Sequence, residues 1–166
     1  MTILKNVFAV NGILEEIEKF SVFPEDYQKI RIKNAVLQAN NILEGMVNLC
    51  ITRYYFDIRK GSENQANHFW INILSTMDFA KKINVLKSIN IFSEDTTKVL
   101  YKINDIRNDV AHYPHRIHKR NKHHLRYDGM KIYEDFNALL KFHSDFEKSV
   151  DELSKYTRKF RNPLVT

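Results

Sequence analysis

Apolar residues recur every three or four positions through most of the chain. The longest stripe in the first half has six members: Val36, Ala39, Leu43, Met46, Cys50 and Tyr54. Because this spacing places side chains on one side of an α-helix, it predicts a helix from about Glu25 to Ile58, ended by Gly61-Ser62. A similar pattern predicts an earlier helix over residues 3–20, ending before Phe23-Pro24.

Three further helical patterns follow. The third predicted helix begins after Gln65 and runs through Leu86, and the fourth begins with a serine cap and two acids at Ser93-Glu94-Asp95. The fourth ends at Tyr113, because Pro114 disfavours the helical conformation of its predecessor. A turn at Asp128-Gly129 precedes the fifth. Their apolar positions are Phe69, Ile73, Leu74, Met77 and Ala80 in the third; Val99, Ile103, Ile106 and Val110 in the fourth; and Ile132, Phe136, Leu139, Leu140, Phe146, Val150 and Leu153 in the fifth.

Helices that each have one apolar face must share a core. We therefore predict an all-α fold, a helical bundle of about five helices in a single domain over residues 1–166. The 166 residues are enough to bury a core, and four glycines and three prolines are too few for a turn-rich sandwich or barrel. No strand is predicted, and the tail, residues 158–166, is expected to be frayed.

The chain has no run of 18 apolar residues and no secretory leader, so we expect a cytoplasmic protein without a membrane span. Cys50 is the single cysteine, which excludes an intrachain disulfide and agrees with a reducing compartment. Since Cys50 lies within an apolar stripe, we predict a buried core thiol rather than a nucleophile.

Positive charge is concentrated in one segment. Residues 112–126 contain five histidines, five Lys or Arg and no acid, and so hold five of the six excess positive charges of the chain. We place a basic loop at residues 113–128 and expect it to contact a polyanion, although a solvated loop is the alternative. The predicted contacts are Tyr113, His115, Arg116, His118, Lys119, Arg120 and Lys122.

Arg107 and His112 are the candidate catalytic residues. A histidine can move a proton at a ribose hydroxyl, and an arginine can bind phosphate oxygens through two parallel hydrogen bonds. Five positions along a helix place the two side chains ~140° apart, so they do not form a tight pair within one regular helix. Ending the helix at Tyr113 would let His112 point into the basic loop. The alternative is structural, with His112 capping carbonyls and Arg107 paired to an acid.

The wording around this pair is more specific than its spacing. Residues 103–112, Ile-Asn-Asp-Ile-Arg-Asn-Asp-Val-Ala-His, resemble the signature of the HEPN superfamily, in which a helix reads roughly I-R-N-x-x-A-H. Both Asn108 and Ala111 match. Residues 79–87 resemble the F-x-x-K-I-x-x-L run that often precedes the motif in bacterial members. The resemblance covers roughly residues 35–112.

This resemblance implies a small helical bundle, commonly dimeric, and for many members a metal-independent endoribonuclease of toxin–antitoxin or antiviral systems. His112 would activate the ribose 2′-hydroxyl, leaving a cyclic phosphate; Arg107 would contact the phosphate, and Asn108 would help fix the geometry. Two motifs often meet across a two-fold axis, which would supply the neighbours that one chain lacks. We therefore expect RNA and a second copy as partners, with neither cofactor nor metal.

An antitoxin or nucleotidyltransferase partner is a further expectation. In toxins paired with minimal nucleotidyltransferases, one residue separates the histidine from a tyrosine, whereas Tyr113 follows His112 directly. Some members of the superfamily are inert, so the alternative function is a non-catalytic module of the same fold that binds RNA or protein.

Four other features have competing interpretations. The histidines of the basic segment suggest zinc, but no cysteine or H-E-x-x-H pattern accompanies them. Glu44 lies on a largely apolar helix, and we predict a salt bridge, to Arg107 or Arg53, rather than catalysis. His143 is predicted to be a core or interface histidine. Tyr127 and Tyr113 border the basic loop and are candidates for base stacking.

Overall fold

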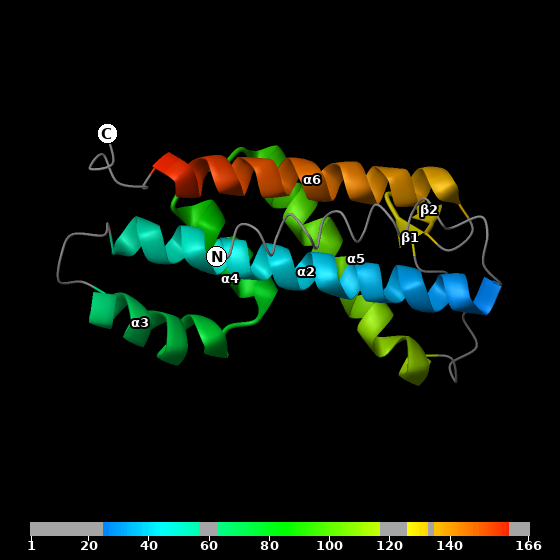
Figure 1. Ribbon diagram of the computed structural model, residues 1–166, viewed down its shortest axis with the longest axis horizontal. Coiled ribbons are helices and arrows are strands. Elements are labelled where there is room, and N and C mark those ends of the chain that lie inside the picture. The colour runs from blue at the N-terminus through cyan, green and yellow to red at the C-terminus, as the bar shows by residue number, and fades with distance from the viewer. Residues whose placement is uncertain (1–24, 57–62, 117–125, 133–134, 160–166) are drawn as a thin grey trace. The chain divides into compact units, whose positions relative to one another are not determined.

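A computed structural model describes residues 25–56, 63–116, 126–132 and 135–159, with only the backbone described at 25–29, 63, 112–116 and 159. Nearly all of this chain is helical (Figure 1), which confirms the predicted all-α helical class. The predicted helix at 3–20, the break at Gly61-Ser62 and the tail from residue 160 lie outside the described residues. The elements are α2 (Glu25–Tyr55), α3 (Glu63–Asn72), η1 (Leu74–Thr76), α4 (Phe79–Ser88), α5 (Glu94–Arg116), β1 (Arg126–Tyr127), β2 (Met130–Lys131) and α6 (Phe136–Lys159).

The chain divides into two compact units that share its three longest helices. Unit 1 contains the described parts of Met1–Ile42 and Lys102–Glu147, and unit 2 those of Leu43–Tyr101 and Lys148–Thr166. Each unit therefore receives one stretch of α2, one of α5 and one of α6. No helix of the described residues is long and apolar enough to cross a membrane.

The apolar stripes of α2, α5 and α6 predict most of the buried side chains of these helices, except near the ends. In the third predicted stripe only Leu74 is buried, and Ile73 is 47% exposed. Val36, Ala39, Leu43 and Cys50 are fully buried on α2. Tyr54, the last predicted member of that stripe, is 44% exposed, because it lies in the final turn of the helix. Likewise, Phe136 and Leu140 in the first turns of α6 are exposed, whereas Phe142, Phe146 and Leu153 are buried.

The third prediction, one continuous helix, is wrong, because the α-helix is interrupted between Ile73 and Asp78. Asp78 has an extended backbone and its carboxylate accepts a hydrogen bond of 2.8 Å from the backbone N–H of Lys81. This bond caps α4 and lowers the pKa of Asp78. The apolar periodicity continues across the break, so it gave no sign of this second helix start.

The predicted helix start at Ser93 is confirmed. The Ser93 hydroxyl accepts a hydrogen bond of 3.2 Å from the Thr96 backbone N–H, and the Thr97 backbone N–H donates to the Ser93 carbonyl. Two acids, Glu94 and Asp95, occupy the first turn of α5, where they interact favourably with the positive end of the helix dipole. This end of α5 therefore follows local rules that are readable from the sequence.

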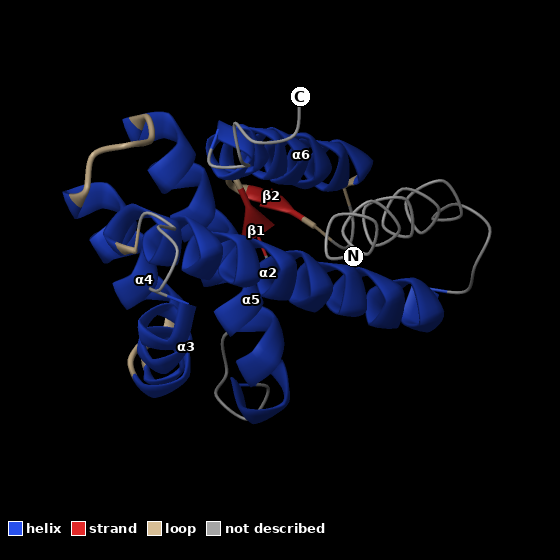
Figure 2. Ribbon diagram, turned by 60° about the vertical axis from the view of Figure 1, so that its left-hand side comes forward, coloured by secondary structure: helices blue, strands red, loops and turns tan. Residues whose placement is uncertain are grey.

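The Asp128-Gly129 turn is also confirmed, and it joins two short strands that were not predicted. Arg126 pairs with Lys131 and Tyr127 with Met130 in an antiparallel hairpin, which Figure 2 shows between helices. Asp128 and Gly129 have φ values of 52° and 83°. Both lie in the left-handed region that a two-residue hairpin turn favours. The bounds predicted for the basic loop, 113–128, are wrong at both ends, because α5 continues to Arg116 and β1 begins at Arg126.

A pair of glycine substitutions tests this turn. A methyl group added at Gly129 or at Gly45 would meet no atom of the described structure within 4 Å, so only backbone conformation distinguishes the two sites. We expect Gly129→Ala to lower the free energy of unfolding by about 1 kcal/mol, because alanine is strained at positive φ. Gly45→Ala, inside α2, should raise it by about 0.5–1 kcal/mol. Urea unfolding measures both, and effects of equal sign would contradict the assignment.

Cys50 is a buried core thiol, as predicted. Its Sγ lies 3.8 Å from the carbonyl oxygen of Leu153 on α6, and burial raises its pKa from 9.0 to about 12. Such a thiol stays protonated, since the low-dielectric core disfavours the thiolate.

The raised pKa of Cys50 predicts an alkaline loss of stability. Above pH 9 the unfolded chain releases the thiol proton while the folded chain retains it, so the free energy of unfolding should fall as pH rises from 9 towards about 12. We expect Cys50→Ala to show a shallower fall in urea unfolding over this range. A residual slope is expected from Tyr127, whose pKa burial also raises. Identical slopes in both proteins would exclude the Cys50 contribution.

Candidate functional site

The candidate site lies on the second half of α5, which is part of unit 1. Ile103, Ile106 and Val110 are buried and form the core-facing stripe of the helix, as the sequence predicts. Asn104 is also buried, with 6% of its surface exposed. These residues determine which side of α5 faces the core, and they leave Arg107, Asn108 and Asp109 half-buried at the edge of that side.

Arg107 is hydrogen-bonded to its neighbour Asn108. The guanidinium Nη1 donates to the amide Oδ1 of Asn108 over 3.0 Å. Within the described residues Arg107 has no carboxylate partner, so the alternative in which it pairs with an acid is not supported there. The amide of Asn108 is neutral, so this contact leaves the guanidinium charge able to bind a phosphate.

His112 lies within α5, and the predicted helix end at Tyr113 is wrong. The helix continues through Tyr113, Pro114 and His115 to Arg116. A proline inside a helix removes one backbone donor, so the carbonyl of Val110 receives no bond from position 114. Because the helix is continuous at position 112, the separation of ~140° between positions 107 and 112 applies within one chain.

Asn108 lies between Arg107 and His112 in the geometry of α5. Position 108 precedes position 112 by four residues, so both lie on the same face of α5. Since the Asn108 amide also accepts from Arg107, it draws the arginine guanidinium from its own position towards that face. The sequence placed Asn108 in the motif, but only the structure shows which partner its side chain holds.

Two acids lie on the same helix close to the motif. Asp105 and Asp109 are four residues apart, and their side chains therefore project from one face. Partial burial and the nearby Asp109 carboxylate raise the pKa of Asp105. Each acid is two positions from Arg107, so neither side chain faces that arginine. This acidic pair was not predicted from the sequence.

The basic segment is held at its far end by the hairpin. Tyr127 is 1% exposed, and its hydroxyl donates a hydrogen bond of 3.0 Å to Asp145 on α6. Its ring also makes an edge-on contact with Phe142, at 5.3 Å between centroids. The prediction that Tyr127 stacks on RNA bases is therefore wrong. Its ring is part of the core, and its hydroxyl is bonded to a buried carboxylate.

Two ion pairs also attach the β1–β2 hairpin to the helices. Lys141 lies 2.8 Å from the buried Asp145 carboxylate, and Lys102 of α5 lies 2.7 Å from Asp128 in the turn. These contacts raise the pKa of Lys141 and lower that of Asp128. The hairpin is thereby attached to both α5 and α6 of unit 1.

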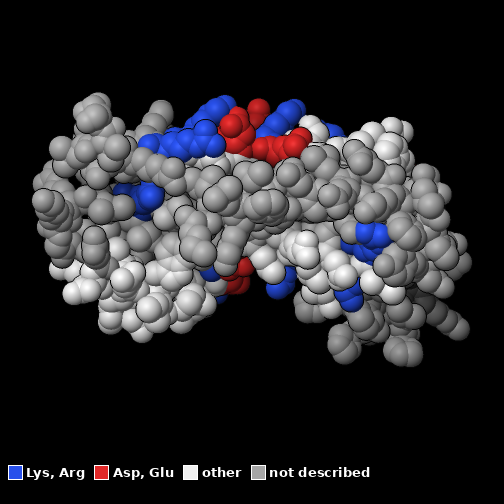
Figure 3. Space-filling view, viewed as in Figure 1, with Lys and Arg blue, Asp and Glu red and all other residues white. Residues whose placement is uncertain are grey.

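The predicted RNA contacts all lie outside the described side chains. His118, Lys119, Arg120 and Lys122 lie in residues 117–125, outside the described residues, and Tyr113, His115 and Arg116 are described only as backbone positions of α5. Elsewhere, charges of both signs alternate along α6, as Figure 3 shows on one face. The ion pair between Lys155 and Asp151 is an example. This mixing is typical of a solvated helix face rather than of a polyanion-binding surface.

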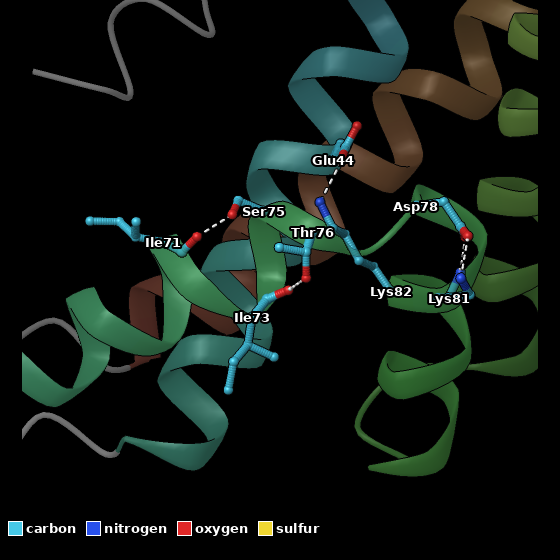
Figure 4. A network of polar contacts seen from close by, with 8 residues as sticks. All are labelled: Glu44, Ile71, Ile73, Ser75, Thr76, Asp78, Lys81 and Lys82. Atoms are coloured by element: carbon cyan, nitrogen blue, oxygen red, sulfur yellow. Dashed lines mark hydrogen bonds and ion pairs between the residues drawn. The ribbon is translucent and has the colours of Figure 1, made fainter.

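Glu44 forms the predicted salt bridge, but with a different partner. Its carboxylate lies 2.5 Å from the ammonium of Lys82 on α4, whose side chain is 3% exposed (Figure 4). The predicted partners, Arg107 and Arg53, are therefore wrong. Arg53 instead donates a hydrogen bond to the backbone carbonyl of Thr157. Lys82 was visible in the sequence only as the lysine of the F-x-x-K-I run.

His143 is a buried histidine, as predicted. It is 7% exposed, and its Nδ1 lies 3.5 Å from the carboxylate of Glu147 one turn later. Its Nε2 is buried and has no hydrogen-bond partner. Among the residues that the structure describes, no three His, Cys, Asp or Glu side chains form a group able to hold a metal ion.

The comparison with known proteins adds no relative. No protein-family model matches the chain, and neither a curated protein nor a solved structure matches it.

Proposed function

We propose that this chain is a metal-independent endoribonuclease of a bacterial toxin–antitoxin or antiviral defence system. The observation that supports it best is the hydrogen bond between Arg107 and Asn108, which directs the guanidinium towards the face of position 112. Among the described residues this arginine has no acidic partner. An imidazole can transfer the proton and a guanidinium can stabilise the phosphate charge when a 2′-hydroxyl attacks a phosphodiester. The resemblance of residues 103–112 to the HEPN signature gives the same assignment.

Each residue has a distinct role in this proposal. His112 acts as the general base or acid at the ribose 2′-hydroxyl, since imidazole titrates near neutral pH. Arg107 binds the phosphate oxygens and stabilises the charge that grows during attack. Asn108 orients the Arg107 guanidinium, and the basic residues Lys119, Arg120 and Lys122 attract the RNA backbone.

The proposed site is shared between two copies of the chain. Positions 107 and 112 lie ~140° apart around one helix, so a single chain does not close a compact pair. A two-fold axis that crosses α5 at a right angle, between positions 107 and 112, would bring Arg107 of one protomer to His112 of its partner. This arrangement makes the site isologous, with each copy supplying the same residues.

Mixing two inactive variants tests the shared site. Arg107→Ala and His112→Ala are each expected to be inactive alone. Mixed and refolded together, they form heterodimers in which the intact arginine of one chain meets the intact histidine of the other, and RNA cleavage should return to roughly one quarter of wild type or more. If both residues act within one chain, no heterodimer contains a complete pair and the mixture stays inactive.

A non-catalytic module that binds RNA is the second candidate, and the same ~140° separation favours it, because one chain alone lacks a closed pair. Such a module should bind RNA without cleaving it. Its affinity should fall steeply with salt and should weaken when Lys119, Arg120 and Lys122 are neutralised together. Filter binding at two salt concentrations, beside a cleavage assay of the same preparation, separates the two functions.

A further inference from the structure

We propose that Asp109 is a positioning residue that holds the His112 ring during RNA cleavage. Asp109 precedes position 112 by three residues on the continuous helix α5, in unit 1, so the two positions are neighbours on one face. A carboxylate at this place accepts a hydrogen bond from one ring nitrogen and leaves the other nitrogen free for the RNA. The assignment rests on the proposed function and adds one residue to its site.

Asp109 shares a face of α5 with Asp105 and position 112. These positions are separated by four and three residues, which places them within about 60° of one another around the helix axis. Asp109 also acts on Asp105 across one turn, because partial burial and the Asp109 carboxylate together raise the pKa of Asp105. Position 107 lies about 160° away from position 109. The carboxylate of Asp109 is therefore suited to the histidine position and not to the arginine.

Asn108 is the other neighbour of position 112 one turn earlier, but its amide oxygen is already engaged. That oxygen accepts the hydrogen bond of 3.0 Å from Arg107. A carboxylate is also a stronger acceptor than an amide, because its charge assists the hydrogen bond. Asp109 is half-buried, so water and salt screen its charge less than they would on an open surface. Asn108 thus holds the arginine, and Asp109 holds the histidine.

The sequence beyond position 112 makes a neighbouring acid valuable. Residues 112–126 contain five Lys or Arg, and positions 115 and 116, one turn after position 112, hold a histidine and an arginine. Positive charge of this kind disfavours a protonated imidazole nearby. Asp109 is the last acid before this segment, and the next acid along the chain is Asp128. The Asp109 carboxylate therefore offsets the local excess of positive charge where His112 must accept a proton.

The contact has a specific role in the proposed reaction. The free ring nitrogen of His112 takes the proton of the 2′-hydroxyl, a bond forms between that oxygen and phosphorus, and the bond from phosphorus to the 5′-oxygen breaks. The leaving oxygen takes a proton from water. The imidazolium formed in the first step is positively charged, and the Asp109 carboxylate stabilises it while remaining ionised.

Substitution of Asp109 tests this role in kinetics. Asp109→Ala should lower kcat for RNA cleavage about 10–100-fold, which is a part of what a positioned base contributes. Asp109→Glu keeps the charge and should recover most of the loss. Asp105→Ala is the matched control, because it removes the same charge from the same face one turn further from His112, and its kcat should equal that of the wild type. Both alanine variants change the attraction of RNA alike, so KM should not separate them. Far-ultraviolet circular dichroism verifies that each variant is folded.

Nitrogen NMR of the His112 ring tests the contact without RNA. The ring signals of His112, one of seven histidines, are assigned by their absence from His112→Ala. In the neutral ring one hydrogen-bonded tautomer should dominate, and Asp109→Ala should move the two nitrogen shifts towards each other as the tautomers mix, whereas Asp105→Ala should not.

Two results overturn the proposal. One is a His112 ring spectrum that is the same in the wild type and in Asp109→Ala, and the other is a kcat that falls equally in Asp109→Ala and Asp105→Ala. A wild type that cleaves no RNA overturns the proposed function instead, and the NMR comparison still decides whether Asp109 holds the ring.

Discussion

Replacing His112 or Arg107 with alanine is expected to reduce RNA cleavage in EDTA by about 10²–10⁴-fold. A positioned general acid or base contributes about this factor, and a guanidinium on the developing phosphate charge contributes a comparable one. Gel analysis of a labelled single-stranded RNA, with detection of a 2′,3′-cyclic phosphate on the product, measures the loss. Asn108→Ala should retain more activity than either, since Asn108 orients Arg107 without touching the reacting atoms.

Lys98→Ala provides the matched control for charge on the same helix. Lys98 is an exposed cation of α5 that pairs with Glu94 over 3.5 Å in unit 2. Its removal changes the net charge by the same amount as Arg107→Ala does. Because Lys98 lies outside the motif, cleavage should remain nearly unchanged. Equal cleavage by the wild type and both motif variants would exclude catalysis by this pair, and cleavage that disappears in EDTA would exclude the metal-independent mechanism.

Glu44→Gln should destabilise the protein by about 3 kcal/mol, the largest stability effect that we expect from a single polar substitution. The Lys82 side chain is 3% exposed, and the Glu44 carboxylate is its charged partner at 2.5 Å. Without that carboxylate, the Lys82 ammonium has no charged partner in a site that water scarcely reaches. Leaving a buried charge uncompensated costs more than the pair itself gains. The midpoint of urea unfolding measures the change.

Substitution of the other partner, Lys82, is the control. Lys82→Met should cost less, about 1 kcal/mol, because Glu44 is 30% exposed and remains partly hydrated when it loses its partner. In the double variant, Glu44→Gln with Lys82→Met, no charge is left buried, so its stability should exceed that expected from adding the single effects. Additive effects, or a larger loss for Lys82→Met than for Glu44→Gln, would contradict this account of the pair.

Local rules predicted the parts of the fold that depend on neighbouring residues. The stripes on α2, α5 and α6, the Ser93 cap and the Asp128-Gly129 turn each require only a few adjacent side chains. Cys50 was placed correctly for the same reason, since three of its neighbours at three or four positions, Met46, Val47 and Tyr54, are apolar. The break at Asp78 was missed because periodicity continues across it, and the backbone gains a cap there instead of a helical turn.

Partners distant in the sequence could not be read from the chain. Glu44 and Lys82 are 38 residues apart, and Tyr127 and Asp145 are 18 apart. Which of several cations meets Glu44, or whether a tyrosine finds a buried carboxylate, depends on packing rather than on pattern. Pro114 shows the converse limit. Proline at this position predicted a helix end, but α5 continues to Arg116. The helix therefore tolerates the loss of one backbone hydrogen bond there.

The contact between α2 and α6 has a consequence for folding kinetics. Cys50 meets Leu153 and Arg53 meets Thr157, so the paired residues are 103 and 104 positions apart, and both helices run in the same direction. Most helical bundles form from neighbouring hairpins and fold rapidly because their contacts are local. Here the last helix completes the core made by an early one, and the loop closed by that contact is long. Folding should therefore be slow for a helical protein, and a chain still emerging from the ribosome leaves the apolar stripe of α2 uncovered until α6 arrives.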